Sequence, residues 1–380
     1  MRKLLIILGV PIDDLDMPQA LARLESFILA GRATGRTHQI ATINADFVVN
    51  SLHDPDLRRI LQESDMATAD GMPLVLGARL LGVALADRVT GADLVPALAE
   101  RSAQQGYSVF LLGARPGVGA RAAEILQERY PGLRIAGVIS PPNLPIEQMD
   151  ASILDQIKAA RPDILLVAFG NPKQEKWIRM YARDLAVPVC IGVGGTFDMI
   201  AGVTRRAPAW MQRSGLEWLY RLAQEPRRLW RRYVHDLLYF GYFFVRQWWA
   251  MRQGTAPAPL LPTSETIIVE QTVILNIDGR MDLNNCAAFV ERAEAALQSS
   301  PNLIVNLSRA TFLDSSAMGA LVALANRARA AGGSLRLAAA PAEIARTLTL
   351  VRLDQFFDIY HDVEAAMDIP FPLMPAVQSA

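Results

Sequence analysis

The sequence predicts an α/β protein in which a Rossmann-like, mostly parallel sheet carries helices on both faces and is followed by a smaller α/β domain. Short apolar runs alternate with segments of helical apolar spacing over residues 1–220, which is the pattern of successive βαβ units. The runs are apolar at nearly every position, as expected for strands covered on both faces. A similar alternation resumes near residue 266.

The expected strands of the first domain lie at 4–10, 39–44, 66–69, 108–113, 134–140, 163–170 and 187–195. The first run resembles the core of a signal peptide, but it is short and no small-residue cleavage pattern follows it, so we expect a buried strand. Ligands bind at the carboxyl ends of strands in such sheets. The candidate ligand loops therefore follow Asn44, Ala69, Gly113, Gly170 and Gly195.

Changes in composition divide the chain into a Rossmann-like core at 1–204, an appendage at 205–252, a linker at 253–265, a second α/β domain at 266–372 and a tail at 373–380. The appendage holds eight arginines between 205 and 232 and many aromatic residues, which predicts a helical element at a membrane surface. A helical hairpin packed on the core or on another subunit is the alternative. Proline and alanine at 253–265 predict the linker.

Overall composition excludes few classes of protein. Lysine plus arginine and aspartate plus glutamate balance at 38 each, so net charge gives no argument for nucleic acid binding. A mean hydropathy of +0.19 leans towards membrane contact, yet no segment reaches the roughly 20 apolar residues of a spanning helix. Cys190 and Cys286 fit neither a disulfide framework nor a zinc site, and we expect two reduced thiols in a cytosolic protein.

Asp70 is the candidate general base. It follows the apolar run 66–69 and precedes a Gly-Met-Pro turn. A carboxylate at a strand end can remove a proton from a substrate hydroxyl. It can equally cap the helix that opens at Gly71, because proline favours the first helical turn. The pattern alone leaves both interpretations open.

Other polar or glycine-rich segments follow the predicted strands. Thr42 and Asn44 can bond sugar hydroxyls or a diphosphate, or Asn44 can cap the next helix. Arg88 is a candidate anion contact, and Lys173 and Gln174 can hold phosphate and sugar hydroxyls or form a solvated first helical turn. The remaining candidate ligand contacts are glycines that allow a diphosphate to approach backbone amides, at Gly113, Gly117, Gly119, Gly194 and Gly195.

A metal site is not expected. The Asp-Asp-Leu-Asp segment at 13–16 contains the Asp-x-Asp pattern of metal-dependent sugar transferases, but helix capping explains it sufficiently. Only four histidines occur, and they form no cluster in the sequence. The glycine turn at 113–119 also lacks the full dinucleotide fingerprint, which argues against a nicotinamide-dependent oxidoreductase.

Six blocks occur in the same order as in one family of enzymes. They are TINADFVV, TADGMPLV, RVTGADLV, FGNPKQEKWI, GVGGTFDMIAG and the arginine-rich segment that begins RRAPAW. Over about residues 1–250 the chain resembles the WecG/TagA/CpsF family of bacterial glycosyltransferases, glycosyltransferase family 26. The resemblance implies an inverting, metal-independent transfer of a sugar from a UDP-sugar to a polyprenyl-diphosphate-linked saccharide in exopolysaccharide or cell-surface polymer synthesis.

The resemblance also implies roles for single residues and a location. Asp70 corresponds to the proposed base, and Thr42, Asn44 and Gln174 to substrate-binding residues, while the appendage, including Arg205 and Arg206, completes the site. No cofactor is implied beyond the UDP-sugar substrate. The protein is expected on the inner face of the cytoplasmic membrane, and a homo-oligomer remains open.

The second domain resembles a STAS domain, on the residues 303–324. The resemblance implies a regulatory or docking role, with a protein partner and phosphorylation at Ser315 or Ser316. Such a phosphate would place negative charge at a helix start. Ala317 stands where glycine commonly follows these serines, and a pure packing module is the alternative. An inactive, transferase-like scaffold that acts through this domain is the alternative for the whole chain.

Overall fold

The computed structural model describes residues 2–253, 266–269 and 272–371. The predicted linker, apart from Gln253, and the predicted tail lie outside these residues. The chain forms two compact units. The larger comprises residues 12–76 and 85–241, and the smaller takes in the described parts of 1–11, 77–84 and 242–380.

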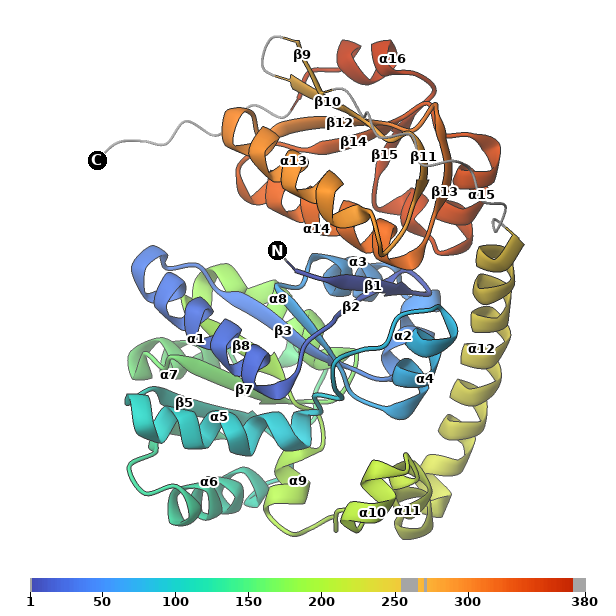
Figure 1. The fold of residues 1–380 in the computed structure, drawn as a ribbon. Helices are drawn as coiled ribbons and strands as arrows, with labels where there is room; N and C mark the ends of the chain where they lie inside the picture. Colours follow the sequence, from blue (N-terminus) through green and yellow to red (C-terminus); the bar gives the residue numbers. More distant parts are fainter. Residues whose placement is uncertain (1, 254–265, 270–271, 372–380) are drawn as a thin grey trace. The chain divides into compact units, whose positions relative to one another are not determined.

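A six-stranded sheet organises the larger unit, and every strand pair in it is parallel (Figure 1). The strand order is β4-β3-β8-β7-β5-β6. The predicted parallel sheet is therefore confirmed. Its strands are β3 (His38–Ile43), β4 (Met66–Ala69), β5 (Ser108–Gly113), β6 (Arg134–Ile139), β7 (Ile164–Ala168) and β8 (Val189–Gly192).

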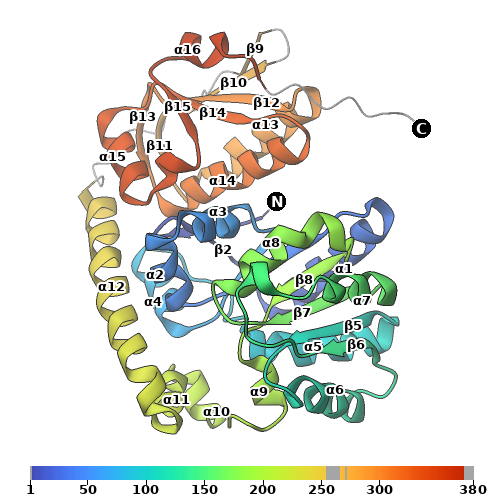
Figure 2. The same cartoon turned by 180° about the vertical axis from the view of Figure 1, so that it is seen from behind.

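Helices cover both faces of this sheet, as the apolar strands predict (Figure 2). Alternate residues of one strand point into different cores, so that Leu111 packs in one core and Leu112 in the other. The first core is closed by α1 (Met17–Thr34), α5 (Gly91–Gln105) and α6 (Val118–Arg129). The second face carries α2 (Ala45–His53), α3 (Pro55–Glu63), α7 (Ser152–Ala160) and α8 (Lys173–Leu185).

The predicted first strand, 4–10, is wrong in its extent and its sheet. The run breaks into β1 (Leu4–Ile7) and β2 (Val10–Asp13), which form a two-stranded sheet of their own. Leu8 and Gly9 have φ values of 49° and 83°, and this left-handed turn ends the extended run. The Asp-x-Asp segment is explained by capping: Asp16 begins α1 with a capping box.

The predicted appendage is helical. It contains α10 (Ala209–Arg213), α11 (Glu217–Gln224) and the long α12 (Pro226–Gln253), preceded by the short α9 (Thr196–Ile200). After Asp70 the chain forms α4 (Met72–Leu80). No helix among the described residues is long and apolar enough to span a membrane.

The smaller unit contains the predicted second α/β domain. Its five-stranded sheet has the order β15-β14-β12-β10-β9, with only β9 antiparallel to its neighbour. The strands are β9 (Thr266–Val269), β10 (Thr272–Asn276), β12 (Asn302–Asn306), β14 (Leu335–Ala338) and β15 (Asp358–Tyr360), with β11 (Gly279–Met281) and β13 (Ala310–Leu313) paired separately. The helices are α13 (Cys286–Ser299), α14 (Ser315–Ala330), α15 (Ala342–Leu350) and α16 (Val363–Asp368).

Candidate active site

Asp70 lies at the carboxyl end of β4, where its backbone N–H donates to Ile43 O at 2.6 Å. Its half-buried carboxylate accepts a hydrogen bond from the backbone N–H of Gly91, the first residue of α5, at 3.2 Å. Burial raises the pKa of Asp70 to about 6, although this hydrogen bond and the positive charge of Arg88 oppose the rise. The carboxylate thus faces the start of α5, and it loses its proton close to neutral pH, as a general base requires.

Two glycines near Asp70, the following Gly71 and its hydrogen-bond donor Gly91, lie next to residues at the end of β3. A Cβ atom on Gly91 would lie 3.4 Å from Oγ1 of Thr42, and one on Gly71 would lie 3.7 Å from Cβ of Asn44. Thr42 is buried and donates to Gly192 O at 3.1 Å. Asn44 caps α2 by accepting from the backbone N–H of Phe47 at 3.3 Å. The structure therefore brings Asp70, Thr42 and Asn44 together, and the capping interpretation also holds for Asn44.

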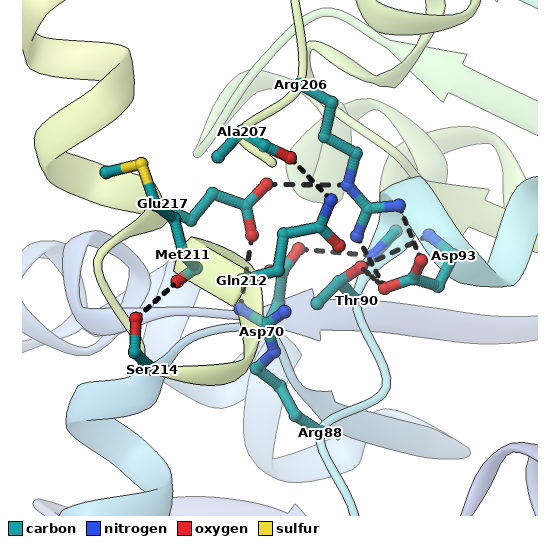
Figure 3. Close-up of polar contacts among 11 residues, drawn as sticks. Asp70, Arg88, Thr90, Asp93, Arg206, Ala207, Met211, Gln212, Ser214 and Glu217 are labelled. Atoms are coloured by element: carbon teal, nitrogen blue, oxygen red, sulfur yellow. Dashed lines mark hydrogen bonds and ion pairs between the residues drawn. The ribbon is translucent and has the colours of Figure 1, made fainter. Parts of the chain in front are cut away.

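An ion-pair network connects the start of α5 to the appendage (Figure 3). Arg206 binds the carboxylate of Asp93 through two hydrogen bonds of 2.5 and 2.7 Å. Glu217 lies between two guanidinium groups, 3.2 Å from Arg88 and 3.5 Å from Arg206. The hydroxyl of Thr90, the N-cap of α5, donates to Oδ2 of Asp93 at 2.7 Å, and this oxygen also accepts from Arg206. The site thus gathers two arginines and three carboxylates.

Arg221 is a further cation near this network. It comes from α11, and its positive charge lowers the pKa of Asp70. Its Nη2 lies 3.9 Å from the position that a Cβ on Gly195 would occupy. Arg205, in contrast, is exposed, and the interactions described for it are backbone hydrogen bonds with Gln224. Of the two arginines predicted in the appendage, Arg206 joins the network with Asp93 and Glu217, whereas Arg205 does not.

Gln174 is buried, and both ends of its amide are engaged. Its Oε1 accepts from the backbone N–H groups of Gly170 and Gly194, at 3.1 and 3.0 Å, and its Nε2 donates to Glu175 at 2.7 Å. Gln174 therefore holds the turns after β7 and β8 together, and in this structure it does not present its amide to a substrate. Lys173 bonds Asn143 at 3.1 Å and stays outside the ion-pair network.

The predicted glycine turn follows β5. Gly113 and Gly117 have φ values of 107° and 81°, and a Cβ on Gly113 would lie 2.7 Å from Ala168 O. Gly119 is buried within α6, where it packs near Val138. Arg115 of this turn pairs with Asp198 of α9 at 2.9 Å. The turn begins α6 with backbone amides, as diphosphate binding requires.

The two serines expected to accept a phosphate are buried. Ser315 and Ser316 are 1% and 6% exposed at the start of α14, whose N-cap is Asp314. The predicted helix start is confirmed, but neither hydroxyl is open to an enzyme in this structure. Phosphorylation there stays a prediction.

Sequence reasoning missed Glu217, Arg221 and the buried Glu175. Glu217 and Arg221 sit one turn apart on α11, and their spacing of four residues was the available signal. Among the described residues, no three histidine, cysteine, aspartate or glutamate side chains are grouped to hold a metal ion.

A cluster of paired arginines and carboxylates thus lies at the carboxyl edge of a parallel sheet, which is where α/β enzymes bind their ligands. Comparison with known proteins gives the family. The model of the WecG/TagA/CpsF glycosyltransferase family matches residues 5–254, and that of the STAS domain matches 263–366. The chain belongs to the WecG/TagA/CpsF glycosyltransferase family and carries a STAS domain.

Two curated relatives are N-acetylglucosaminyldiphosphoundecaprenol N-acetyl-β-D-mannosaminyltransferases, from Bacillus spizizenii and Bacillus subtilis. Each is 34% identical over 193 residues, which cover 51% of this chain and 73% of the relative. Solved structures that match the STAS segment include the unphosphorylated anti-sigma factor antagonist SpoIIAA (19% identity, TM-score 0.26) and an antagonist from Mycobacterium paratuberculosis (20%, 0.25). Each match covers 28% of this chain and 94% or 91% of that structure, respectively.

Proposed function

We propose that the protein is an inverting glycosyltransferase that moves a sugar from a UDP-sugar to a polyprenyl-diphosphate-linked saccharide in the synthesis of a bacterial exopolysaccharide or cell-surface polymer. The observation that carries the proposal is the half-buried Asp70 carboxylate, placed at a strand end beside arginines and a helix start. The named relatives support an acceptor of this class. N-acetylmannosamine, its uronic acid and glucose all remain candidates for the transferred sugar.

Asp70 is the base of the proposed reaction. It removes the proton of the acceptor hydroxyl while that oxygen attacks the anomeric carbon. The new glycosidic C–O bond forms as the bond between the anomeric carbon and the phosphate oxygen breaks on the opposite face, which inverts the configuration. UDP leaves with the bonding electron pair, and Asp70 holds the proton. A positioned base contributes on the order of 10²–10⁴ in rate.

The charge that develops on the departing diphosphate needs positive partners. Arg88 and Arg221 act on the charge of Asp70, and Arg206 belongs to the same ion-pair network through Glu217. Guanidinium groups suit two-point contacts with phosphate oxygens. The amides of the glycine turn that starts α6 are a further source. We propose that these groups stabilise the leaving group without a resident cofactor.

Membrane attachment on the cytoplasmic face is part of the proposal. The helix α12 exposes an apolar stripe, in which Leu237 is 68% exposed and Trp249 61% exposed. The other members of the stripe follow at helical spacing, at Trp230, Val234, Leu238, Tyr242 and Val245. Exposed apolar side chains in this number mark a surface that contacts lipid or protein. A lipid-linked acceptor makes lipid the occupant that we propose.

The substitution Asp70→Asn tests the proposed base. We expect normal UDP-sugar binding by calorimetry and a loss of on the order of 10²–10⁴ in the rate of sugar transfer.

Products of a panel of UDP-sugars with a polyprenyl-diphosphate-linked acceptor would be identified by mass spectrometry. Asp184→Asn, an exposed carboxylate at the end of α8, is the control. Near-normal turnover of Asp70→Asn would remove Asp70 from the base role, and a wild-type protein without any transfer would favour the inactive scaffold.

A further inference from the structure

The helix α14 of the STAS domain is buried on all sides over its first three turns. Every residue from Ser315 to Ala325 is buried. A helix that packs on a sheet with one face keeps polar residues on the other, whereas an apolar helix without a polar face needs cover all round. The STAS sheet and α13 cover part of α14. A second layer must cover the rest.

The first strand of the chain supplies that layer. Leu4 and Ile6 of β1 belong to the same hydrophobic core as Leu321 of α14 and Val305 of β12. A Cβ on Gly319 would lie 2.2 Å from Leu4 O, so only glycine admits the strand at this distance. The strand β1 lies next to α14 (Figure 1).

Gln247 of α12 forms hydrogen bonds with the N-terminal segment and with the start of α14. Its side chain is fully buried, its Oε1 accepts from Leu8 N at 2.8 Å, and its Nε2 donates to Ile6 O at 2.9 Å. The same Nε2 lies 3.4 Å from Oγ of Ser315, and Met251 Sδ lies 3.2 Å from that oxygen. One glutamine therefore satisfies the strand backbone and reaches the start of α14.

The turn after β1 also packs against the STAS domain. Gly9 has a φ of 83°, and a Cβ there would lie 2.3 Å from Val351 O, directly after α15. The segment from Leu4 to Gly9 thus meets the STAS domain through an apolar strand face, two close backbone approaches and a shared glutamine. These contacts are those of a built interface between distant parts of one chain.

We propose that the N-terminal part of α14 is an intramolecular docking surface, and that its occupant is the chain's own residues 4–9 held by Gln247. The STAS domain is then fastened to the beginning of its own chain rather than presented to a foreign protein. A partner that recognises Ser315 or Ser316 must first displace this segment.

The experiment is hydrogen exchange with mass spectrometry on the full chain. Gln247→Met keeps the size of the side chain but leaves Leu8 N–H without its acceptor. We expect exchange of residues 4–8 and of the start of α14 to accelerate about tenfold or more, because the variant leaves a buried amide without a hydrogen-bond acceptor. Gly319→Val is the second variant and should act on the same peptides. Gln105→Met, an exposed glutamine at the end of α5, is the control.

Three results would overturn the proposal. Exchange of residues 4–8 within seconds in the wild-type chain would show that the strand is not docked. Protection that disappears on dilution, together with a dimer by light scattering, would make a second copy the occupant. If Gly319→Val does not fold, Gln247→Met alone decides, and unchanged exchange in that variant also contradicts the docking.

Discussion

Asp70 acquires its proposed role from its surroundings. Burial raises its pKa to about 6, so the base form predominates above that pH and is lost below it. We therefore expect kcat/KM to fall tenfold per pH unit below about pH 6 and to level off above it, since kcat/KM reports the free enzyme. The measurement is a pH profile from 5 to 7.5, with the folded fraction checked at each pH. A profile without this inflection would contradict a base of this pKa.

Glu175 is a buried carboxyl whose Oε1 accepts from Gln174 Nε2, while its Oε2 has no hydrogen-bond partner among the residues that the structure describes. Burial raises its pKa to about 8, so the folded protein keeps the proton at neutral pH. The unfolded chain loses that proton near the ordinary value of about 4.3. The neutral carboxyl of Glu175 therefore contributes to the free energy of unfolding in full below about pH 4.3. This contribution is lost as the pH rises towards 8, because the unfolded chain gives up the proton and the folded protein does not.

Glu175→Gln removes this titration and keeps the shape of the side chain. We expect the Tm of the variant, relative to the wild type, to rise between pH 5 and pH 8. One kcal/mol corresponds to about 2–4 °C in a domain of this size. Calorimetry across this range measures the difference, and Glu147→Gln, at an exposed position, is the control. A difference in Tm that stays constant with pH would mean that Glu175 is already ionised in the fold.

Glu217 forms ion pairs with Arg88 and Arg206. These are two of the arginines proposed to bind the diphosphate, so Glu217 competes with it for their positive charge. Glu217→Gln removes that competing charge, and it also removes a negative charge that raises the pKa of Asp70. We expect UDP to bind several-fold more tightly in calorimetry and the inflection of the pH profile to move to lower pH. Weaker binding would instead show that Glu217 orients the two arginines for the substrate.

At the scale of elements, α12 carries the exposed apolar stripe. Replacing Trp230 and Leu237 by serine removes two exposed apolar side chains from one face of the helix. Each buried side chain of this kind contributes about 1.5–3 kcal/mol. We expect at least a tenfold loss of partitioning into anionic vesicles in a sedimentation assay. Leu29→Ser, at a 58% exposed position of α1, is the matched control. Equal partitioning of both variants would assign the stripe to a protein contact.

The sequence predicts strands and helices well where the apolar residues follow a single regular spacing. The strands β3 to β8 lie within a few residues of their expected positions, and all of them except the partly exposed β6 are buried along their whole length. The run 4–10 is as apolar as the strands of the sheet, so its pattern does not distinguish it from them. The left-handed Leu8-Gly9 turn and the packing of β1 against α14 depend on residues more than 300 positions away.

At the scale of the whole molecule, only part of the candidate site could be predicted. Thr42 lies near the end of β3, Asn44 follows β3, and Asp70 follows the adjacent strand β4. A parallel sheet brings these three residues to one edge without help from the rest of the chain. Glu217 and Arg221 arrive from a helix about 150 residues later, and no local pattern fixes that placement. The inward direction of Gln174 likewise depends on the amides of two separate turns.

The division into two units predicts how the chain unfolds. Ile6 lies in the core of the STAS domain, although it precedes that domain by more than 250 residues, whereas Leu111 lies in the core of the six-stranded sheet. Substitution of such a side chain by alanine costs about 2–5 kcal/mol. In calorimetry we expect Ile6→Ala to lower the same thermal transition as Leu321→Ala, and Leu111→Ala to lower the other. If Ile6→Ala instead follows Leu111→Ala, the first strand is a part of the transferase sheet in solution, and the shared core with α14 is not what stabilises it.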